Sequence, residues 1–151
     1  LAGPTVTLLG RQSQEQVEAL MSSCRAFVYA GLEDFGIAPV EAMAAGARVI
    51  GLGRGGLLDT VRCATTGLEQ ATGVLFPDQS VRSLVEAVSW FEQKRIWRQL
   101  DAAEIRQWAE RFRPEAFKAR FEATLRQAWT AHQSRCAVAA SDPAGMPALQ
   151  L

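Results

Sequence analysis

The 151 residues are 48% hydrophobic and 21% charged, and basic and acidic side chains balance to a formal net charge of zero. This composition predicts an ordinary globular domain with its own core, and a neutral chain gives no argument for nucleic-acid binding. No apolar run approaches the ~18 residues of a membrane helix. The three cysteines lie far apart in the sequence, which excludes a disulfide framework or a clustered metal site and favours a reducing cytosol.

The charges are unevenly distributed. Acidic residues outnumber basic ones over residues 1–93, and the reverse holds over residues 94–151. Solvated helix faces explain most of this asymmetry, and contact with an anionic membrane or a partner domain is the alternative. We therefore expect a cytoplasmic protein, with peripheral attachment at the inner face of the membrane as a second option. The chain starts at Leu1 rather than Met, so we expect a fragment or an excised domain.

Helical patterns alternate with short apolar runs over the first half of the chain. A capping box of Ser13 and Gln16 predicts a helix that runs to about residue 24 and buries Val17, Leu20 and Met21. A second helix is predicted over residues 38–45 and a short third one over 57–61. Four apolar runs predict strands, of which the second is continuously apolar and therefore expected to be buried on both faces: residues 6–9, 26–30, 49–52 and 73–76.

From Ser80 onward the chain has a helical pattern. Apolar residues recur at 3.6-residue spacing after Ser80, again around Ile105, and once more after Pro114. Beyond about Arg135, Pro, Gly and Ala occur without periodicity. We therefore expect residues 1–134 to be the folded domain and residues 135–151 to be a disordered tail.

The alternation of strands and helices predicts an α/β fold with a parallel sheet and flanking helices, followed by a helical C-terminal segment. Ligands of such sheets bind beyond the carboxyl ends of the strands. Glu33, Glu41 and the loop Gly53–Gly56 all follow predicted strands and fall at that edge. The sequence therefore predicts a ligand site there.

Two glutamates flank the start of the second helix. Glu41 is the only charged residue in the run Phe35–Ala47, which is typical of a short buried helix, where an isolated carboxylate is costly. Glu33 precedes Gly36, which lets a ligand approach the backbone, and free amides at a helix start attract phosphate. Phosphate donors with two hydroxyl acceptors suit a sugar nucleotide. A solvated loop acid and a salt-bridged helix acid explain the pair equally well.

The stretch EDFGIAPVEAMAAGARVIGLGRGGLLDTV resembles the donor-binding signature of family 4 glycosyltransferases, which are retaining enzymes of the GT-B fold. The similarity extends from about Val6 to Phe121 and includes Gly55-Gly56 and the run TGVLFPDQSVRSLVEAV. It is nearest to the bacterial branch of mannosyltransferases in surface-polysaccharide assembly. The resemblance implies the Rossmann-like C-terminal half of a GT-B enzyme, incomplete at its N-terminus.

The resemblance also implies roles for individual residues. Glu33 would lie beside the donor sugar as the catalytic residue, and Glu41 would bind the ribose hydroxyls. In this family, front-face attack by the acceptor explains why the anomeric configuration of the sugar is retained, so Glu33 is not expected to be a nucleophile. Neither a metal nor a resident cofactor is expected. The expected donor is a nucleotide-diphosphate sugar such as GDP-mannose. Other residues are expected to contact the donor: Phe35, Gly36, Ile37, Gly55, Gly56 and Arg54, the last with solvent exposure as its alternative.

The sequence departs from the family pattern because it lacks two parts of the family's binding site. The Arg and Lys that bind the donor diphosphate lie upstream of Val6 in the family, and so does the N-terminal domain that binds a glycan or lipid-linked acceptor. Smaller departures are Ala47 in place of proline and Asp59 in place of glutamate. We therefore expect this chain alone to be inactive.

Other interpretations of the sequence compete with a glycosyltransferase. The run from Gly51 to Gly56 matches the G-x-G-x-x-G dinucleotide fingerprint, but it lacks the acid expected about 20 residues on. His132 is the only histidine and lies far from the signature, and the tryptophans are expected to pack in helices. A non-catalytic module that binds a nucleotide or a partner is the alternative function. A sugar-nucleotide epimerase would need acid and base residues that are not evident.

Overall fold

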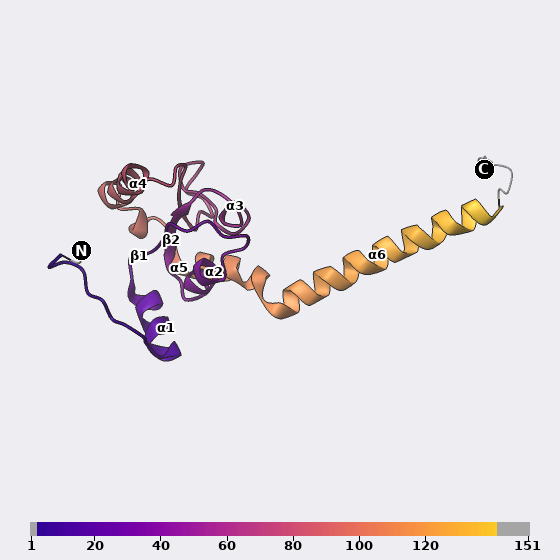
Figure 1. The fold of residues 1–151 in the computed structure, drawn as a ribbon, viewed down its shortest axis with the longest axis horizontal. Coiled ribbons are helices and arrows are strands. Elements are labelled where there is room, and N and C mark those ends of the chain that lie inside the picture. Colours follow the sequence, from indigo (N-terminus) through magenta and orange to yellow (C-terminus); the bar gives the residue numbers. More distant parts are fainter. Residues whose placement is uncertain (1–2, 142–151) are drawn as a thin grey trace, which may run out of the picture. The chain divides into compact units, whose positions relative to one another are not determined.

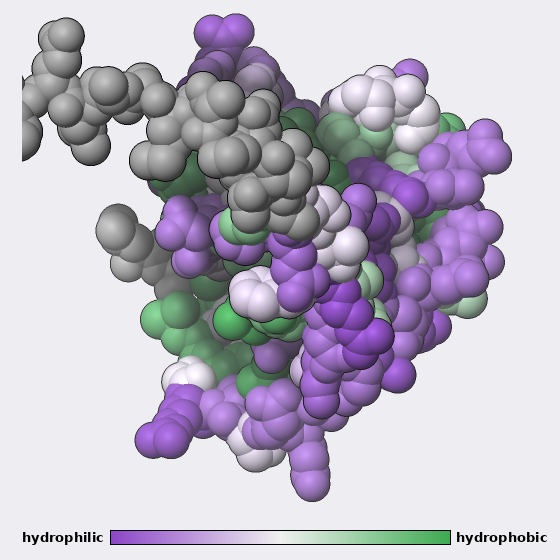
Figure 2. Space-filling model, turned by 90° about the vertical axis from the view of Figure 1, so that its right-hand side faces the viewer, coloured by the Kyte–Doolittle hydropathy of each residue, from purple (hydrophilic) through white to green (hydrophobic). Residues whose placement is uncertain are grey.

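The computed structural model describes the backbone of residues 3–141 and the side-chain surroundings of residues 3–136. The chain divides into two compact units, Leu1–Arg111 and Phe112–Leu151. Figure 1 shows the ribbon, and Figure 2 shows one face of the molecule, where hydrophilic side chains (purple) are widespread and hydrophobic ones (green) form smaller groups.

The first unit is built on a parallel sheet of three strands in the order β1-β2-β3. The strands are β1 (Ala26–Tyr29), β2 (Arg48–Leu52) and β3 (Gly73–Phe76). The α-helices of this unit are α1 (Gln14–Ser23), α2 (Ile37–Ala44), α3 (Leu57–Thr60), α4 (Val81–Gln93) and α5 (Ala102–Ala109). Two short 3₁₀ helices accompany them, η1 (Ile96–Arg98) and η2 (Glu110–Phe112). The last residue of η2, Phe112, is the first residue of the second unit. The α/β class with flanking helices is thereby confirmed.

Helices α2 and α4 contact the sheet, and α5 packs on α2 (Figure 1). The core contains the inner residues of β2 and β3 together with Met43, Leu57, Phe91 and Ile105, all of which are buried. Burying this set of large side chains, at about 1.5–3 kcal/mol each, is the main stabilising contribution to the unit. Trp90, Trp97 and Trp108 pack against the same cluster, which confirms the expected packing role for these three tryptophans.

The helix boundaries follow from local chemistry. Ser13 and Gln16 form the predicted capping box at the start of α1, and the Ser80 side chain caps α4. Helix α2 is followed by Gly46 with φ +92, a left-handed conformation that glycine adopts at helix C-termini without strain. The predicted strands at 49–52 and 73–76 are confirmed as β2 and β3.

Three predictions about the N-terminal part are wrong. Residues 6–9 form no strand, because no described strand lies beside them, and Leu8 is 82% exposed. Helix α1 buries none of its residues, and Leu20 is exposed, because α1 contacts mainly α2. Strand β1 is not buried on both faces, since it is the edge strand and Val28 is exposed.

The free edge of β3 is partly closed. The Gly73 N–H donates to the Arg62 carbonyl, and the Gly73 carbonyl accepts from the Ala64 N–H. The Leu75 N–H reaches the Cys63 sulfur at 3.2 Å. Pro77 follows the strand and has no N–H to offer.

The second unit consists mainly of α6 (Pro114–Ser141). The side chains of Phe117, Phe121, Leu125 and Trp129 are exposed along it. The helix continues through Ser141, so residues 135–141 of the expected disordered tail are helical, and residues 142–151 lie outside the described part of the chain. No helix among the described residues is long and apolar enough to cross a membrane.

Candidate functional site

The predicted site residues follow the carboxyl ends of the strands. Strand β1 ends at Tyr29, β2 at Leu52 and β3 at Phe76, and three loops extend from these points. The loops are tied together across the edge of the sheet. The Gln79 side-chain amide donates to the Ala30 carbonyl at 3.2 Å, and the Gly53 N–H donates to the Phe76 carbonyl at 2.8 Å. The sheet therefore presents one continuous surface at this edge.

Glu33 lies exposed in the loop between β1 and α2. The Tyr29 hydroxyl donates a hydrogen bond to Glu33 Oε1. This hydrogen bond is the main cause that raises the pKa of the Tyr29 phenol above its usual value, followed by desolvation and by the negative charge of Glu33. The pair joins the end of the strand to the acid of the loop. Sequence reasoning missed Tyr29 because it was read as part of a buried strand; the spacing Tyr-x3-Glu at a strand end was the available signal.

The backbone of the Glu33 loop rests on Gly55 and Gly56. The Gly56 N–H donates to the Glu33 carbonyl at 2.8 Å. A Cβ added at Gly55 would lie 2.3 Å from that same carbonyl oxygen, and one at Gly56 would lie 2.4 Å from Phe35 Cα. Real Cβ contacts are never this short, so only glycine fits at either position. The expected turn is present, and its glycines face the loop that carries Glu33.

The N-terminus of α2 has no side-chain cap. Its N-cap residue is Gly36, with φ +83, a left-handed conformation that L side chains rarely adopt. Ile37 in the first turn is 67% exposed, and Phe35 just before the cap is 45% exposed. Among the residues that the structure describes, no side-chain hydrogen bond caps this helix start, and the helix dipole favours a negatively charged group there.

Glu41 is exposed, so the expectation of a carboxylate within a buried helix is wrong. Only one side of α2 is buried, through Pro39, Ala42 and Met43, and Glu41 lies on the opposite side, one turn after Ile37. A run of small apolar residues concealed this amphipathic arrangement. Glu41 lines a groove of about 650 Å³ between α1 and α2, whose lining does not include Glu33.

Arg54 is exposed and lies 3.4 Å from Asp78, measured from Nη2 to Oδ1. The pair connects the loop after β2 with the loop after β3. Both side chains are more than half exposed, so the attraction is weak and the guanidinium stays accessible to solvent. A contact of Arg54 with the donor therefore stays a prediction.

The glycine pattern from Gly51 to Gly56 serves packing. A Cβ on Gly51 would lie 2.3 Å from Leu57 Cδ2, and one on Gly53 would lie 3.3 Å from Leu75 Cβ. The helix that follows, α3, is only four residues long. A dinucleotide fingerprint requires a longer helix whose N-terminus holds the pyrophosphate, so the motif does not have that structural context.

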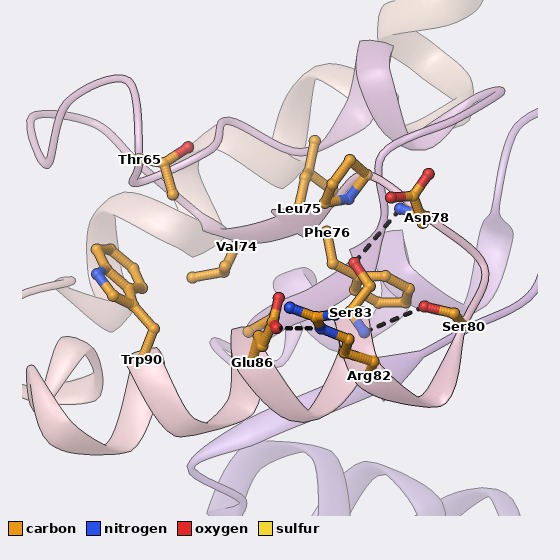
Figure 3. A pocket seen from close by; sticks show the side chains of 12 residues that line it. Thr65, Val74, Leu75, Phe76, Asp78, Ser80, Arg82, Ser83, Glu86 and Trp90 are labelled. Atoms are coloured by element: carbon orange, nitrogen blue, oxygen red, sulfur yellow. Dashed lines mark hydrogen bonds and ion pairs between the residues drawn. The ribbon is translucent and has the colours of Figure 1, made fainter.

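A second cavity, of about 470 Å³, lies beside β3 and α4 (Figure 3). Trp90 and Thr65 lie toward one end of it, and Asp78 and Ser80 toward the other. Arg82 and Glu86 pair at 2.8 Å on the α4 side. The sequence shows only the i,i+4 spacing of Arg82 and Glu86, which is common on exposed helices. This cavity was therefore not predicted from the sequence. Within the described residues, no group of three or more His, Cys, Asp or Glu side chains could hold a metal ion.

A parallel sheet whose loops meet at its carboxyl edge defines a Rossmann-like α/β domain. A family model described as glycosyl transferases group 1 matches residues 1–111, and the chain belongs to this family. Among solved structures, it is similar to a sucrose-phosphate synthase from Thermosynechococcus elongatus, with 28% sequence identity and a TM-score of 0.67. The match covers 85% of this chain and 31% of that one, so this chain spans about a third of its neighbour. Comparison with curated protein sequences gives no match.

Proposed function

We propose that this chain is the donor-binding half of a retaining glycosyltransferase of family 4. The proposed reaction transfers a sugar, mannose from GDP-mannose being the preferred candidate, to a glycan or lipid-linked acceptor bound by a second domain. The observation that carries the proposal is the segment from Glu33 to Glu41. It begins with an exposed carboxylate and a helix N-terminus without a side-chain cap, and a second exposed carboxylate follows one turn into α2.

Each part of this segment suits one part of a sugar nucleotide. The first amides of α2 and the helix dipole would hold the diphosphate. Glu41, one turn further along the exposed side of α2, would accept hydrogen bonds from the ribose diol. Glu33 would lie beside the transferred sugar and stabilise the transition state there. The acceptor hydroxyl would attack the face from which the diphosphate departs, and the departing diphosphate would accept its proton, so no covalent enzyme nucleophile is needed.

Calorimetric titration of this chain with GDP, UDP and ADP tests the donor assignment. We expect weak binding with GDP preferred, and Glu41→Ala should weaken it by about tenfold or more, since a hydrogen bond to a charged group contributes roughly 1.5–3 kcal/mol. Glu69→Ala removes an exposed acid from another loop and serves as the matched control. Equal binding by wild type and Glu41→Ala would contradict the ribose assignment.

Transfer activity separates the enzyme from the alternative, a non-catalytic module that binds a nucleotide or a partner. In the complete glycosyltransferase, with an acceptor-binding half present, Glu33→Ala should reduce transfer on the order of a hundredfold while nucleotide affinity changes little, as expected for an interaction made in the transition state. Nucleotide binding without any transfer would favour the module.

A further inference from the structure

Glu33 is restrained at two points, one on its backbone and one on its side chain. Its carbonyl accepts the Gly56 N–H at 2.8 Å, and its carboxylate accepts the Tyr29 hydroxyl at Oε1. In the described part of the chain, no other hydrogen bond or ion pair reaches this carboxylate. Tyr29 is thus the side chain that determines where an otherwise solvent-exposed carboxylate points.

The Tyr29 ring is itself fixed in place. It stacks on Phe27 with ring centroids 6.3 Å apart and an interplanar angle of 11°. It also lies against Gly31, where an added Cβ would be 3.0 Å from both Cε1 and the hydroxyl oxygen. Because a tyrosine has only two side-chain torsions, a packed ring holds its hydroxyl with little further loss of entropy. The hydroxyl is therefore a well-defined donor at the end of β1.

We propose that Tyr29 is a positioning residue that orients Glu33 in the proposed glycosyltransferase. Its hydroxyl holds one carboxylate oxygen and leaves the other for a hydroxyl of the donor sugar. This inference rests on the proposed function, and Tyr29 acts through Glu33 rather than on substrate. A free glutamate side chain samples several rotamers, and catalytic groups must be held within about 0.5 Å of the productive geometry. The hydrogen bond restricts Glu33 before substrate arrives.

A titration of this chain tests the contact in solution. Tyr29 is the only tyrosine in the sequence, so the ultraviolet absorbance of tyrosinate reports this residue alone. The hydrogen bond and the neighbouring charge of Glu33 both stabilise the protonated phenol, so Glu33→Gln should lower the pKa of Tyr29 toward its ordinary value of 10.0. Glu41→Gln, which removes the other acid of the segment, should leave the titration unchanged. An unchanged titration in Glu33→Gln would overturn the proposal.

A double-mutant cycle in the complete glycosyltransferase tests the positioning role. Tyr29→Phe removes only the hydroxyl and keeps the ring on Phe27 and Gly31. We expect kcat to fall by about ten- to a hundredfold, with KM for the donor almost unchanged. In the Glu33→Ala background, Tyr29→Phe should have no further effect, because the hydroxyl has lost its acceptor. A merely structural role would not produce this non-additivity.

The outcomes separate the inference from the proposed function. If Glu33→Ala abolishes transfer while Tyr29→Phe is fully active, or if the two losses multiply, the positioning role is overturned and the glycosyltransferase stands. If Glu33→Ala leaves transfer unchanged, the role of Glu33 fails, and the role of Tyr29 fails with it. Gly31→Ala, which displaces the ring without removing the hydroxyl, should reproduce the kinetic defect of Tyr29→Phe.

Discussion

Gly55 adopts φ +60 directly against the loop that carries Glu33, so it combines two reasons to be glycine. Gly55→Ala adds backbone strain and a Cβ that would meet the Glu33 carbonyl. Gly10 has a similar φ of +64 but nothing within 4 Å of its missing Cβ. Gly10→Ala therefore measures the strain alone, and the difference between the two variants measures the contact.

We expect Gly55→Ala to lower the free energy of unfolding by about 1–3 kcal/mol more than Gly10→Ala does, which is the usual cost of overpacking. Urea denaturation followed by circular dichroism gives both values. Equal losses in the two variants would show that Gly55 does not support the Glu33 loop.

Cys24 provides a second test at the level of single residues. Burial raises the pKa of its thiol, although its backbone hydrogen bond and the charge of Arg48 act in the opposite direction. Since the thiolate is the reactive form, iodoacetamide should modify half-buried Cys24 several-fold more slowly than exposed Cys136 at neutral pH. Mass spectrometry of partly labelled protein measures both rates. Equal rates would mean that the first turns of the chain open readily in solution.

At the scale of elements, α3 follows the loop after β2 and packs against the start of α2. Its first residue, Leu57, is fully buried and lies so close to Gly36 and Gly51 that a Cβ at either glycine would collide with it. Leu57→Ala leaves a cavity beneath the N-terminus of α2. We expect a loss of about 2–5 kcal/mol in the free energy of unfolding and weaker nucleotide binding.

The exposed neighbour Leu58 serves as the control for this prediction. Leu58→Ala should change stability by no more than about 0.5 kcal/mol, as surface substitutions usually do. Thermal and urea unfolding of both variants, with calorimetric titration of GDP, provide the comparison. A small loss in Leu57→Ala would contradict the packing that links α3 to the site.

Elements with strong local signals could be predicted from the sequence. Strands β2 and β3 and helices α2 and α4 were found because apolar runs and helical spacing are local features of the sequence. Burial was harder to predict, because it depends on neighbours. The run at 6–9 is as apolar as a strand, yet no described strand lies beside it, and α1 has the right cap but no core to cover.

The place of the candidate residues in the fold was partly predictable from the sequence, and their contacts were not. The carboxyl edge of the sheet, Glu33 and the glycine turn follow from the order of the elements. The hydrogen bond from Tyr29, and the fit of Gly55 and Gly56 against the Glu33 loop, depend on loop geometry that no periodicity encodes. Glu41 was misplaced because the other seven residues of α2 are all apolar and do not reveal which side of the helix faces the core.

For the molecule as a whole, the ion pairs seen among the described residues contribute little to stability. The pairs found among the described residues join side chains that are each at least 44% exposed. Such pairs contribute about 0–1 kcal/mol, and molar salt screens them. Unfolding at low ionic strength and in molar potassium chloride should therefore differ by less than about 1 kcal/mol. A large loss in salt would point to a network of charges that these contacts do not contain.

The two outer strands of the sheet, β1 and β3, differ in how many unpaired backbone groups they leave for a strand of another chain. Beside β3, the segment around Cys63 and the missing N–H of Pro77 leave few groups for a new strand to pair with. Beside β1, no described strand covers the backbone, and the exposed Val28 adds an apolar surface. The sheet can therefore be extended more readily past β1 than past β3, whose outer side is partly paired. Concentrated solutions of this chain should associate through the β1 edge, and a charged residue in place of Val28 should suppress that association.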